Sequence, residues 1–88
     1  MNIRIDRSFE KATDKIKDRK LLNKIARVID EIKEQHVYSK IKNLKKIKGS
    51  HQYYRIRIGD YKNGITIAGD MVTFIRFLHR KDIYKYFP

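Results

Sequence analysis

The chain lacks cysteine, long apolar runs and a balanced share of acidic residues. Without cysteine, disulfide bonds and thiolate zinc sites are excluded, and the composition suits a reducing cytoplasm. No apolar run approaches the roughly 18 residues of a membrane span, and residues 1–6 lack the apolar stretch of a signal peptide. We therefore expect a cytoplasmic protein with no membrane partner.

The chain is short and strongly basic. Its 88 residues predict one small domain over residues 1–88, near the size at which a single core gives little net stability. Lys and Arg number 22 against 10 Asp and Glu, which gives a formal net charge of +12. Residues 40–62 alone hold 8 of the basic residues and 1 acidic residue. Such a cationic surface attracts nucleic acid, acidic protein or anionic membrane.

The most regular pattern lies in residues 53–62. Polar and apolar residues alternate at its start, as in a half-buried strand, with Arg55 and Arg57 on the polar side. The pair Gly59-Asp60 then predicts a two-residue hairpin turn. In that register Arg57 faces Lys62, so three cations gather on one face of the predicted sheet.

This cluster of Arg55, Arg57 and Lys62 needs an explanation, because like charges opposite each other destabilise a sheet. Binding a polyanion is one explanation, and Gly64, expected opposite Arg55, would leave room for a ligand near the backbone. A solvated cationic face that protects a sheet edge explains the same residues equally well.

The first half of the chain predicts a helical hairpin. Residues 3–5 alternate weakly, as in a short strand. Apolar residues recur at helical spacing in residues 9–16 and again in residues 21–35. Asp6 or Ser8 can cap the first helix, and Asp18 can cap the second. The link between the two helices is so short that they must form an antiparallel pair.

The second half predicts strands. Residues 65–67 continue the hairpin, Gly69-Asp70 predicts a second tight turn, and residues 71–78 are nearly all apolar, which suits a central strand covered on both faces. Residues 82–88 are expected to form a helical turn or an irregular tail. The predicted fold class is α+β, with the N-terminal helical hairpin packed on one face of a small antiparallel sheet.

Residues 37–50 form a basic connector whose few apolar residues are expected to hold it against the domain. Contacts to a phosphate backbone and a solvated lysine-rich loop explain this segment about equally well. The candidate RNA-binding residues in and just after it are Lys42, Lys45, Lys46, Lys48 and Tyr53.

Few kinds of chemistry fit these residues. The three histidines, His36, His51 and His79, are far apart and have no carboxylate at ligand spacing. No phosphate-binding glycine loop precedes a helix. We therefore expect no metal and no cofactor. A cationic sheet face with histidine and tyrosine nearby suits RNA cleavage by the 2′-hydroxyl, which needs a developing phosphorane neutralised and two protons moved.

The position of the histidine depends on strand register. Regular pairing across the second turn places Thr73, Ile75, Phe77 and His79 on the cationic face with Lys62. A one-residue bulge would instead exchange His79 with Arg80 on that face.

Three runs of sequence carry a resemblance: LKKIKG at residues 44–49, YYRIRIGDYK at residues 53–62 and HRKDIY at residues 79–84. Together with the helical hairpin, they resemble the RelE/ParE superfamily of bacterial toxin–antitoxin toxins over nearly the whole chain. For the RelE branch the resemblance implies a small antiparallel sheet with helices on one side and cleavage of mRNA in the ribosomal A site. It also implies an acidic or amphipathic antitoxin partner and a toxin–antitoxin hetero-oligomer.

The resemblance further implies a set of catalytic residues on the exposed sheet face and near the C-terminus. Arg55 and Arg57 stand where the family has lysines, and arginine, with a pKa above about 12, is a poor proton acceptor. His79, as a side chain with an unperturbed pKa near 6.5, is a candidate for that role. The candidate catalytic residues are Arg55, Arg57, Lys62, His79, Arg80 and Tyr84.

Two other functions fit parts of the sequence. The ParE branch shares the fold, poisons DNA gyrase and needs no cationic cluster. A plain RNA-binding module would also use a cationic sheet, although the exposed aromatic row expected of an RNA-reading sheet is missing.

Overall fold

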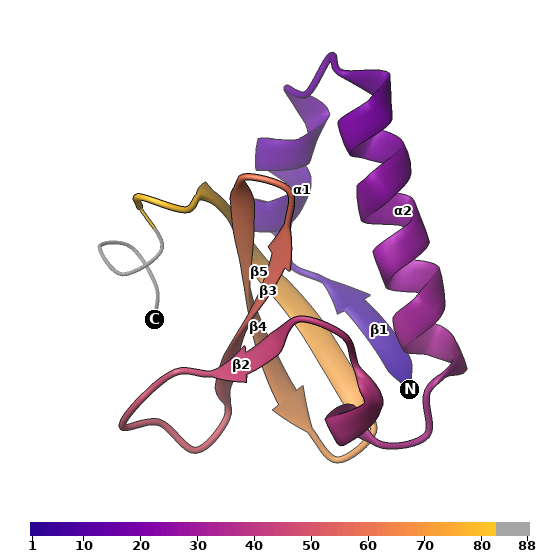
Figure 1. The fold of residues 1–88 in the computed structure, drawn as a ribbon, viewed down its shortest axis with the longest axis vertical. Coiled ribbons are helices and arrows are strands. Elements are labelled where there is room, and N and C mark those ends of the chain that lie inside the picture. The colour runs from indigo at the N-terminus through magenta and orange to yellow at the C-terminus, as the bar shows by residue number, and fades with distance from the viewer. Residues whose placement is uncertain (83–88) are drawn as a thin grey trace.

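The structure is a computed structural model that describes residues 1–82. Tyr84 and most of the predicted C-terminal tail lie outside the described residues. A five-stranded sheet, in the order β1-β5-β4-β3-β2, packs against two helices (Figure 1). The α+β class predicted from the sequence is confirmed. The elements are β1 (Asn2–Ile5), α1 (Arg7–Asp14), α2 (Arg19–Glu34), η1 (Tyr38–Lys40), β2 (Leu44–Lys46), β3 (Tyr53–Ile58), β4 (Tyr61–Ala68) and β5 (Met71–His79).

Both helices begin at predicted N-caps: α2 at Asp18, and α1 at Asp6, one of the two candidates Asp6 and Ser8. The carboxylate of Asp6 accepts a hydrogen bond from the backbone N–H of Ser8, and that of Asp18 accepts from Lys20 and Leu21 at 2.9 and 3.3 Å. Each aspartate has extended backbone angles and supplies an acceptor for N–H groups that have no partner within the helix. Two short polar side chains therefore fix where the helical hairpin starts and where it turns.

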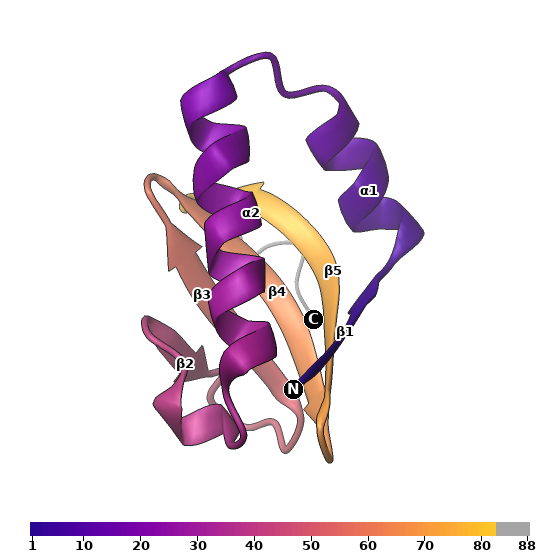
Figure 2. The same cartoon turned by 90° about the vertical axis from the view of Figure 1, so that its right-hand side faces the viewer.

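The core lies between the helices and one face of the sheet. In Figure 2, α2 lies across that face, in front of β3 and β4. The fully buried side chains of Ile32, Ile56, Ile65 and Phe74 meet there. The ring of Phe9 from α1 packs edge-on against Phe74, with centroids 5.2 Å apart. No described helix covers the opposite face of the sheet, which we call the open face.

Both predicted tight turns are present. Gly59 and Gly69 have φ angles of +61° and +59°, a region that residues with a Cβ rarely adopt, so glycine fits both turns. The β3–β4 register is as predicted: Arg57 pairs with Lys62, and Arg55 pairs with Gly64. The turn and the register of the charged β3–β4 hairpin were therefore predicted correctly from the sequence.

Three parts of the sheet differ from the prediction. Residues 44–46 form the edge strand β2, which was expected to be loop, because three residues carry too little pattern to reveal a strand made by pairing with β3. The short strand β1 pairs in parallel with β5, so the sheet is mixed. The expectation that residues 71–78 are covered on both faces was wrong. Val72 and Phe74 are buried against the helices, whereas Thr73 on the open face is only half-buried.

One extra residue, Ile75, interrupts the pairing of β5 with β4. Ile65 pairs with Phe74, but the preceding Gly64 pairs with Arg76, so Ile75 has no partner on β4. This is a β-bulge, and it reverses the faces of all β5 residues that follow it.

The reversal corrects the predicted positions of two residues on β5. Phe77 and His79 face the helices, and Leu78 takes the open face opposite Lys62. The phenyl ring of Phe77 is buried, lies 6.0 Å from that of Phe9 and stacks at 4.7 Å on Tyr61. The physical reason is that regular pairing would have turned the charged Arg76 into the core and this phenyl ring out of it.

The N-terminal cap of α1 also contacts the bulge. The hydroxyl of Ser8 lies 2.6 Å from the carboxylate of Asp6 and 2.5 Å from the carbonyl oxygen of Ile75, and it accepts a hydrogen bond from Arg76. Since a hydroxyl has one proton, it donates to one of the two oxygens at a time. The hydrogen bonds from Ser8 and the charge of Arg76 lower the pKa of Asp6 below its ordinary value of 3.8.

Among residues 1–82, one polar side chain is fully buried. Asn63, opposite Ile56 on β3 and Phe77 on β5, donates a hydrogen bond from Nδ2 to the carbonyl oxygen of Ile56 at 3.3 Å. Its Oδ1 atom accepts no hydrogen bond from a described residue. A buried acceptor without a donor lowers stability.

Candidate active site

Four cations meet on the open face. Arg55 and Arg57 point there from β3, and Lys62 joins them across the β3–β4 hairpin. Lys45, on the newly found strand β2, pairs with Arg55 and so shares its face. Together with Asn43 these residues line a hollow of about 310 Å³. The structure thus brings together the predicted triple cluster and one of the predicted RNA-binding lysines.

A fifth cation, Arg80, lies close to the same hollow. Its backbone N–H donates to the carbonyl oxygen of Asp60 at 3.0 Å, which holds the end of β5 against the β3–β4 turn. The bulge at Ile75 exchanges the two faces for the residues after it, so the position that follows His79 falls on the open face. Its charge contributes to lowering the pKa of Lys62. We refer to Lys45, Arg55, Arg57, Lys62 and Arg80 as the cationic cluster.

The surroundings of Lys62 affect its protonation. Burial of its ammonium group lowers its pKa below the usual 10.5, and the positive charges of Arg55, Lys45, Arg57 and Arg80 lower it further. Each of these causes disfavours the protonated form. The site therefore keeps a lysine whose proton is held less tightly than that of an exposed lysine.

His79 lies away from the cluster. Its register partner is Tyr61, and the two rings meet edge-on with centroids 5.7 Å apart on the face that carries the helices. Its Nδ1 accepts a long hydrogen bond of 3.4 Å from the backbone N–H of Lys81. The prediction that His79 shares the open face with Lys62 was wrong, and the bulge at Ile75 is the reason.

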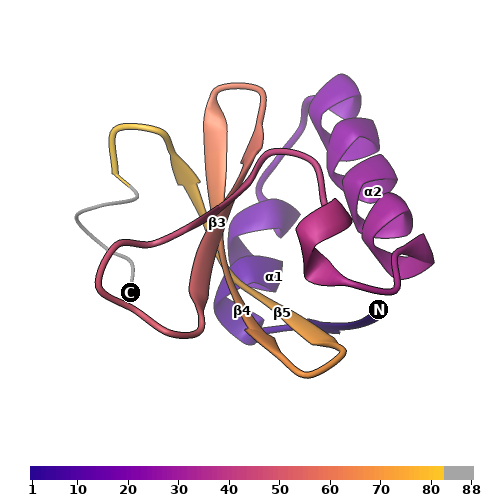
Figure 3. The ribbon, with the colours of Figure 1, turned by 60° about the horizontal axis from the view of Figure 1, so that its bottom comes forward.

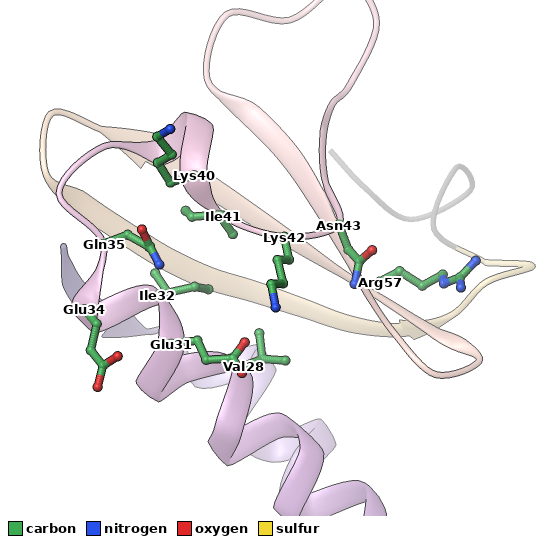
Figure 4. Close-up of a pocket in the computed structure, with 10 residues that line it drawn as sticks. All are labelled: Val28, Glu31, Ile32, Glu34, Gln35, Lys40, Ile41, Lys42, Asn43 and Arg57. Atoms are coloured by element: carbon green, nitrogen blue, oxygen red, sulfur yellow. The ribbon is translucent and has the colours of Figure 1, made fainter.

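Lys42 belongs to a different hollow. The connector begins with η1, which lies beside the C-terminal end of α2 (Figures 1 and 3). Between α2 and this connector is a groove of about 240 Å³. In Figure 4, Lys42 points across it toward Glu31 of α2, while Arg57 points away from both. Lys42 is thus directed toward the helix side of the molecule and does not line the hollow of the cationic cluster.

The remaining candidates are dispersed. Lys46 lines a small hollow with Tyr38 and Tyr54, on the face opposite to Lys45. Lys48 is exposed in the turn between β2 and β3. Tyr53, at the start of β3, shares the face of Arg55, and its carbonyl oxygen accepts a hydrogen bond from Ser50 at 3.1 Å.

Sequence reasoning missed Asn43. It lines both the cationic hollow and the groove beside α2, and its φ angle of +62° is left-handed. Asparagine tolerates that conformation better than most residues do. An asparagine just before Leu44-Lys45-Lys46 was the available signal for a sharp turn into an edge strand.

A curated relative and several solved structures resemble this chain. The relative is Toxin RelE3 from Methanocaldococcus jannaschii, 48% identical over 66 residues, which are 74% of this chain and 75% of the relative. Among solved structures, a chain of the RelB–RelE antitoxin–toxin complex from Methanococcus jannaschii has 39% identity and a TM-score of 0.79, covering 97% of this chain and 99% of that one. No family model matches.

More distant structures show the same fold. A chain of the RelE–RelB complex from Pyrococcus horikoshii is 17% identical with a TM-score of 0.73, covering 90% of this chain and 93% of that one. The YoeB dimer from Staphylococcus aureus is also 17% identical, with a TM-score of 0.72, covering 91% and 97%. Within the described residues, no helix is long and apolar enough to cross a membrane. With 48% identity to a RelE toxin over three quarters of its length, the chain belongs to the RelE family, the toxins of toxin–antitoxin pairs.

Proposed function

We propose that this protein is a ribosome-dependent endonuclease that cuts mRNA by attack of a ribose 2′-hydroxyl on the neighbouring phosphate. The observation that carries the proposal is the cationic cluster, which gathers the positive charge of three strands and the end of β5 around one hollow. The transition state of this reaction gains negative charge on phosphate oxygens, and fixed cations stabilise it.

The arginines have the clearest roles. Arg57 is exposed and lines the hollow, so it is available to a phosphate from solvent, and its planar guanidinium group suits paired hydrogen bonds to phosphate oxygens. Arg55, half-buried between Lys45 and Gly64, would supply a second positive charge from beneath. Arg80 would stabilise the departing oxygen. Tyr84, outside the described residues, keeps the catalytic role that the resemblance implies.

Two other functions are less well supported. Inhibition of DNA gyrase would not require five cations around one hollow. Plain RNA binding through the sheet would require exposed aromatic residues on the open face, and among the described strand residues that face carries mainly charged, threonine and aliphatic side chains.

We also propose that an acidic or amphipathic antitoxin binds this protein in a hetero-oligomer. The relative from Methanococcus jannaschii was solved in an antitoxin–toxin complex. A net charge of +12 on 88 residues would accelerate association with an acidic partner. Co-expression with the product of the neighbouring gene should give a complex that survives purification at moderate salt. Failure to co-purify any partner would contradict this part of the proposal.

The nuclease proposal is tested by adding the purified protein to ribosomes programmed with a defined mRNA and mapping new 5′ ends by primer extension. We expect cleavage only when ribosomes are present and the mRNA occupies the A site. A gyrase supercoiling assay with the same preparation is the matched test of the alternative. Intact mRNA together with inhibited supercoiling would reject the nuclease and favour the gyrase inhibitor.

A further inference from the structure

Attack by a 2′-hydroxyl requires a group that accepts its proton, and the arrangement of the open face limits which residue this is. Arginine side chains remain protonated at any working pH, so Arg55, Arg57 and Arg80 cannot accept that proton. His79 was the candidate from sequence, but its ring packs on Tyr61 on the opposite face of the sheet. Within residues 1–82, a proton acceptor must therefore come from the other residues that line the hollow.

Asn43 and two lysines line the rest of the hollow. The amide of Asn43 is not a base at any working pH. Lys45 is exposed on the edge strand, where water solvates its charged form. Lys62 is half-buried on β4, the middle strand of the sheet, with Arg57 on one side and the apolar Leu78 on the other. A lysine acts as a base when its ammonium form is poorly solvated. Of the two lysines, Lys62 is the less exposed and meets this condition better.

We infer that Lys62 is the general base that removes the proton of the attacking 2′-hydroxyl, an inference that rests on the proposed nuclease function. Its position permits this role, because it lines the same hollow as Arg55 and Arg57, which would hold the phosphate beside that hydroxyl.

The charges around Lys62 act in the required direction. Arg55 and Arg57 face it from β3, Lys45 from β2 and Arg80 from the end of β5. Together with burial, these four cations lower the pKa of Lys62, which increases the neutral fraction able to accept a proton near neutral pH. Leu78, its neighbour on β5, contributes no charge.

The neutral Nζ of Lys62 takes the proton of the 2′-hydroxyl and becomes an ammonium ion, while the 2′-oxygen forms a bond to phosphorus. The bond between phosphorus and the 5′-oxygen breaks, and that oxygen takes a proton from water. The products are a 2′,3′-cyclic phosphate and a 5′-hydroxyl end, and Lys62 returns its proton to solvent.

The test uses Lys62→Arg, which keeps the positive charge but cannot act as a base. Single-turnover cleavage of ribosome-bound mRNA should fall by roughly 10²- to 10⁴-fold, the usual contribution of general acid–base catalysis, whereas binding to ribosomes should not change. Lys24→Arg is the matched control, an equal substitution at an exposed lysine of α2 on the other side of the sheet, and it should cleave like wild type. A Lys62→Arg protein that cleaves like wild type overturns the inference.

A second measurement is the dependence of the cleavage rate on pH. The single-turnover rate of the wild-type protein should rise about tenfold per pH unit below the pKa of Lys62 and level off above it, since only the neutral form accepts a proton. A flat profile, or one unchanged in Lys62→Arg, overturns the inference while leaving the nuclease proposal intact. A wild-type protein that never cuts mRNA overturns the proposed function and this inference with it.

Discussion

Two adjacent residues on β3 allow function to be separated from folding. Arg57 is exposed on the open face, whereas the side chain of Ile56 is fully buried on the other. Arg57→Ala should lower mRNA cleavage by roughly 10²- to 10³-fold, the range found for loss of one oxyanion donor. Its free energy of unfolding should change by less than about 0.5 kcal/mol, as for most surface substitutions, because the variant also removes a cation that faces Lys62.

The opposite result is expected for Ile56→Ala. Its side chain has no exposed surface and lies in the core with Ile65 and Phe74. Truncating such a residue costs about 2 to 5 kcal/mol, from lost burial and the cavity left behind. Net stability of a single domain is roughly 5 to 15 kcal/mol, so the variant should unfold at a clearly lower urea concentration than wild type.

Urea unfolding followed by circular dichroism measures the stability of both variants, and primer extension on programmed ribosomes measures cleavage. Arg27→Ala, at an exposed arginine of α2, controls for the loss of one positive charge far from the hollow, and it should cleave like wild type. If Arg57→Ala stays folded and cleaves as fast as Arg27→Ala, the open face is not the active site. Inhibition of DNA gyrase would then be the better-supported function.

Three further variants test the fold. Asn63→Leu removes the buried amide whose Oδ1 has no described donor. It should raise the free energy of unfolding by about 1 kcal/mol, the lower end of the penalty for such a group, and a loss of stability in urea titration would contradict this. Asp18→Ala removes the N-cap of α2 and should cost about 0.5 to 2 kcal/mol, with Asp18→Asn as the control that retains the cap. Asp6 has a lowered pKa in the folded state because Ser8 donates to it and Arg76 is near. Its ionised form therefore adds stability above the ordinary pKa of 3.8, and that stability is lost as the pH falls through the lower folded value. The stability difference between wild type and Asp6→Asn should shrink over that acidic range, and a difference independent of pH would refute the assignment.

Local patterns in the sequence determined the helical hairpin and the charged β-hairpin. Asp6 and Asp18 supply acceptors to N–H groups within three residues, so these helix starts depend on neighbours in the chain. Gly59 permits the left-handed turn that places Arg57 opposite Lys62. Because a two-residue turn fixes register, the centre of the cationic cluster could be predicted from a ten-residue stretch.

Tertiary structure alone decided the rest of the site. Strand β2 exists through pairing with β3, and only that pairing adds Lys45 to the cluster. The bulge at Ile75 is favoured because it buries Phe77 beside Phe9 and keeps Arg76 out of the core, contacts with residues far away in sequence. That single extra residue turned His79 away from the site. Alternation along a strand gives the two faces, but which residue occupies each face after a bulge depends on what the helices have room to bury.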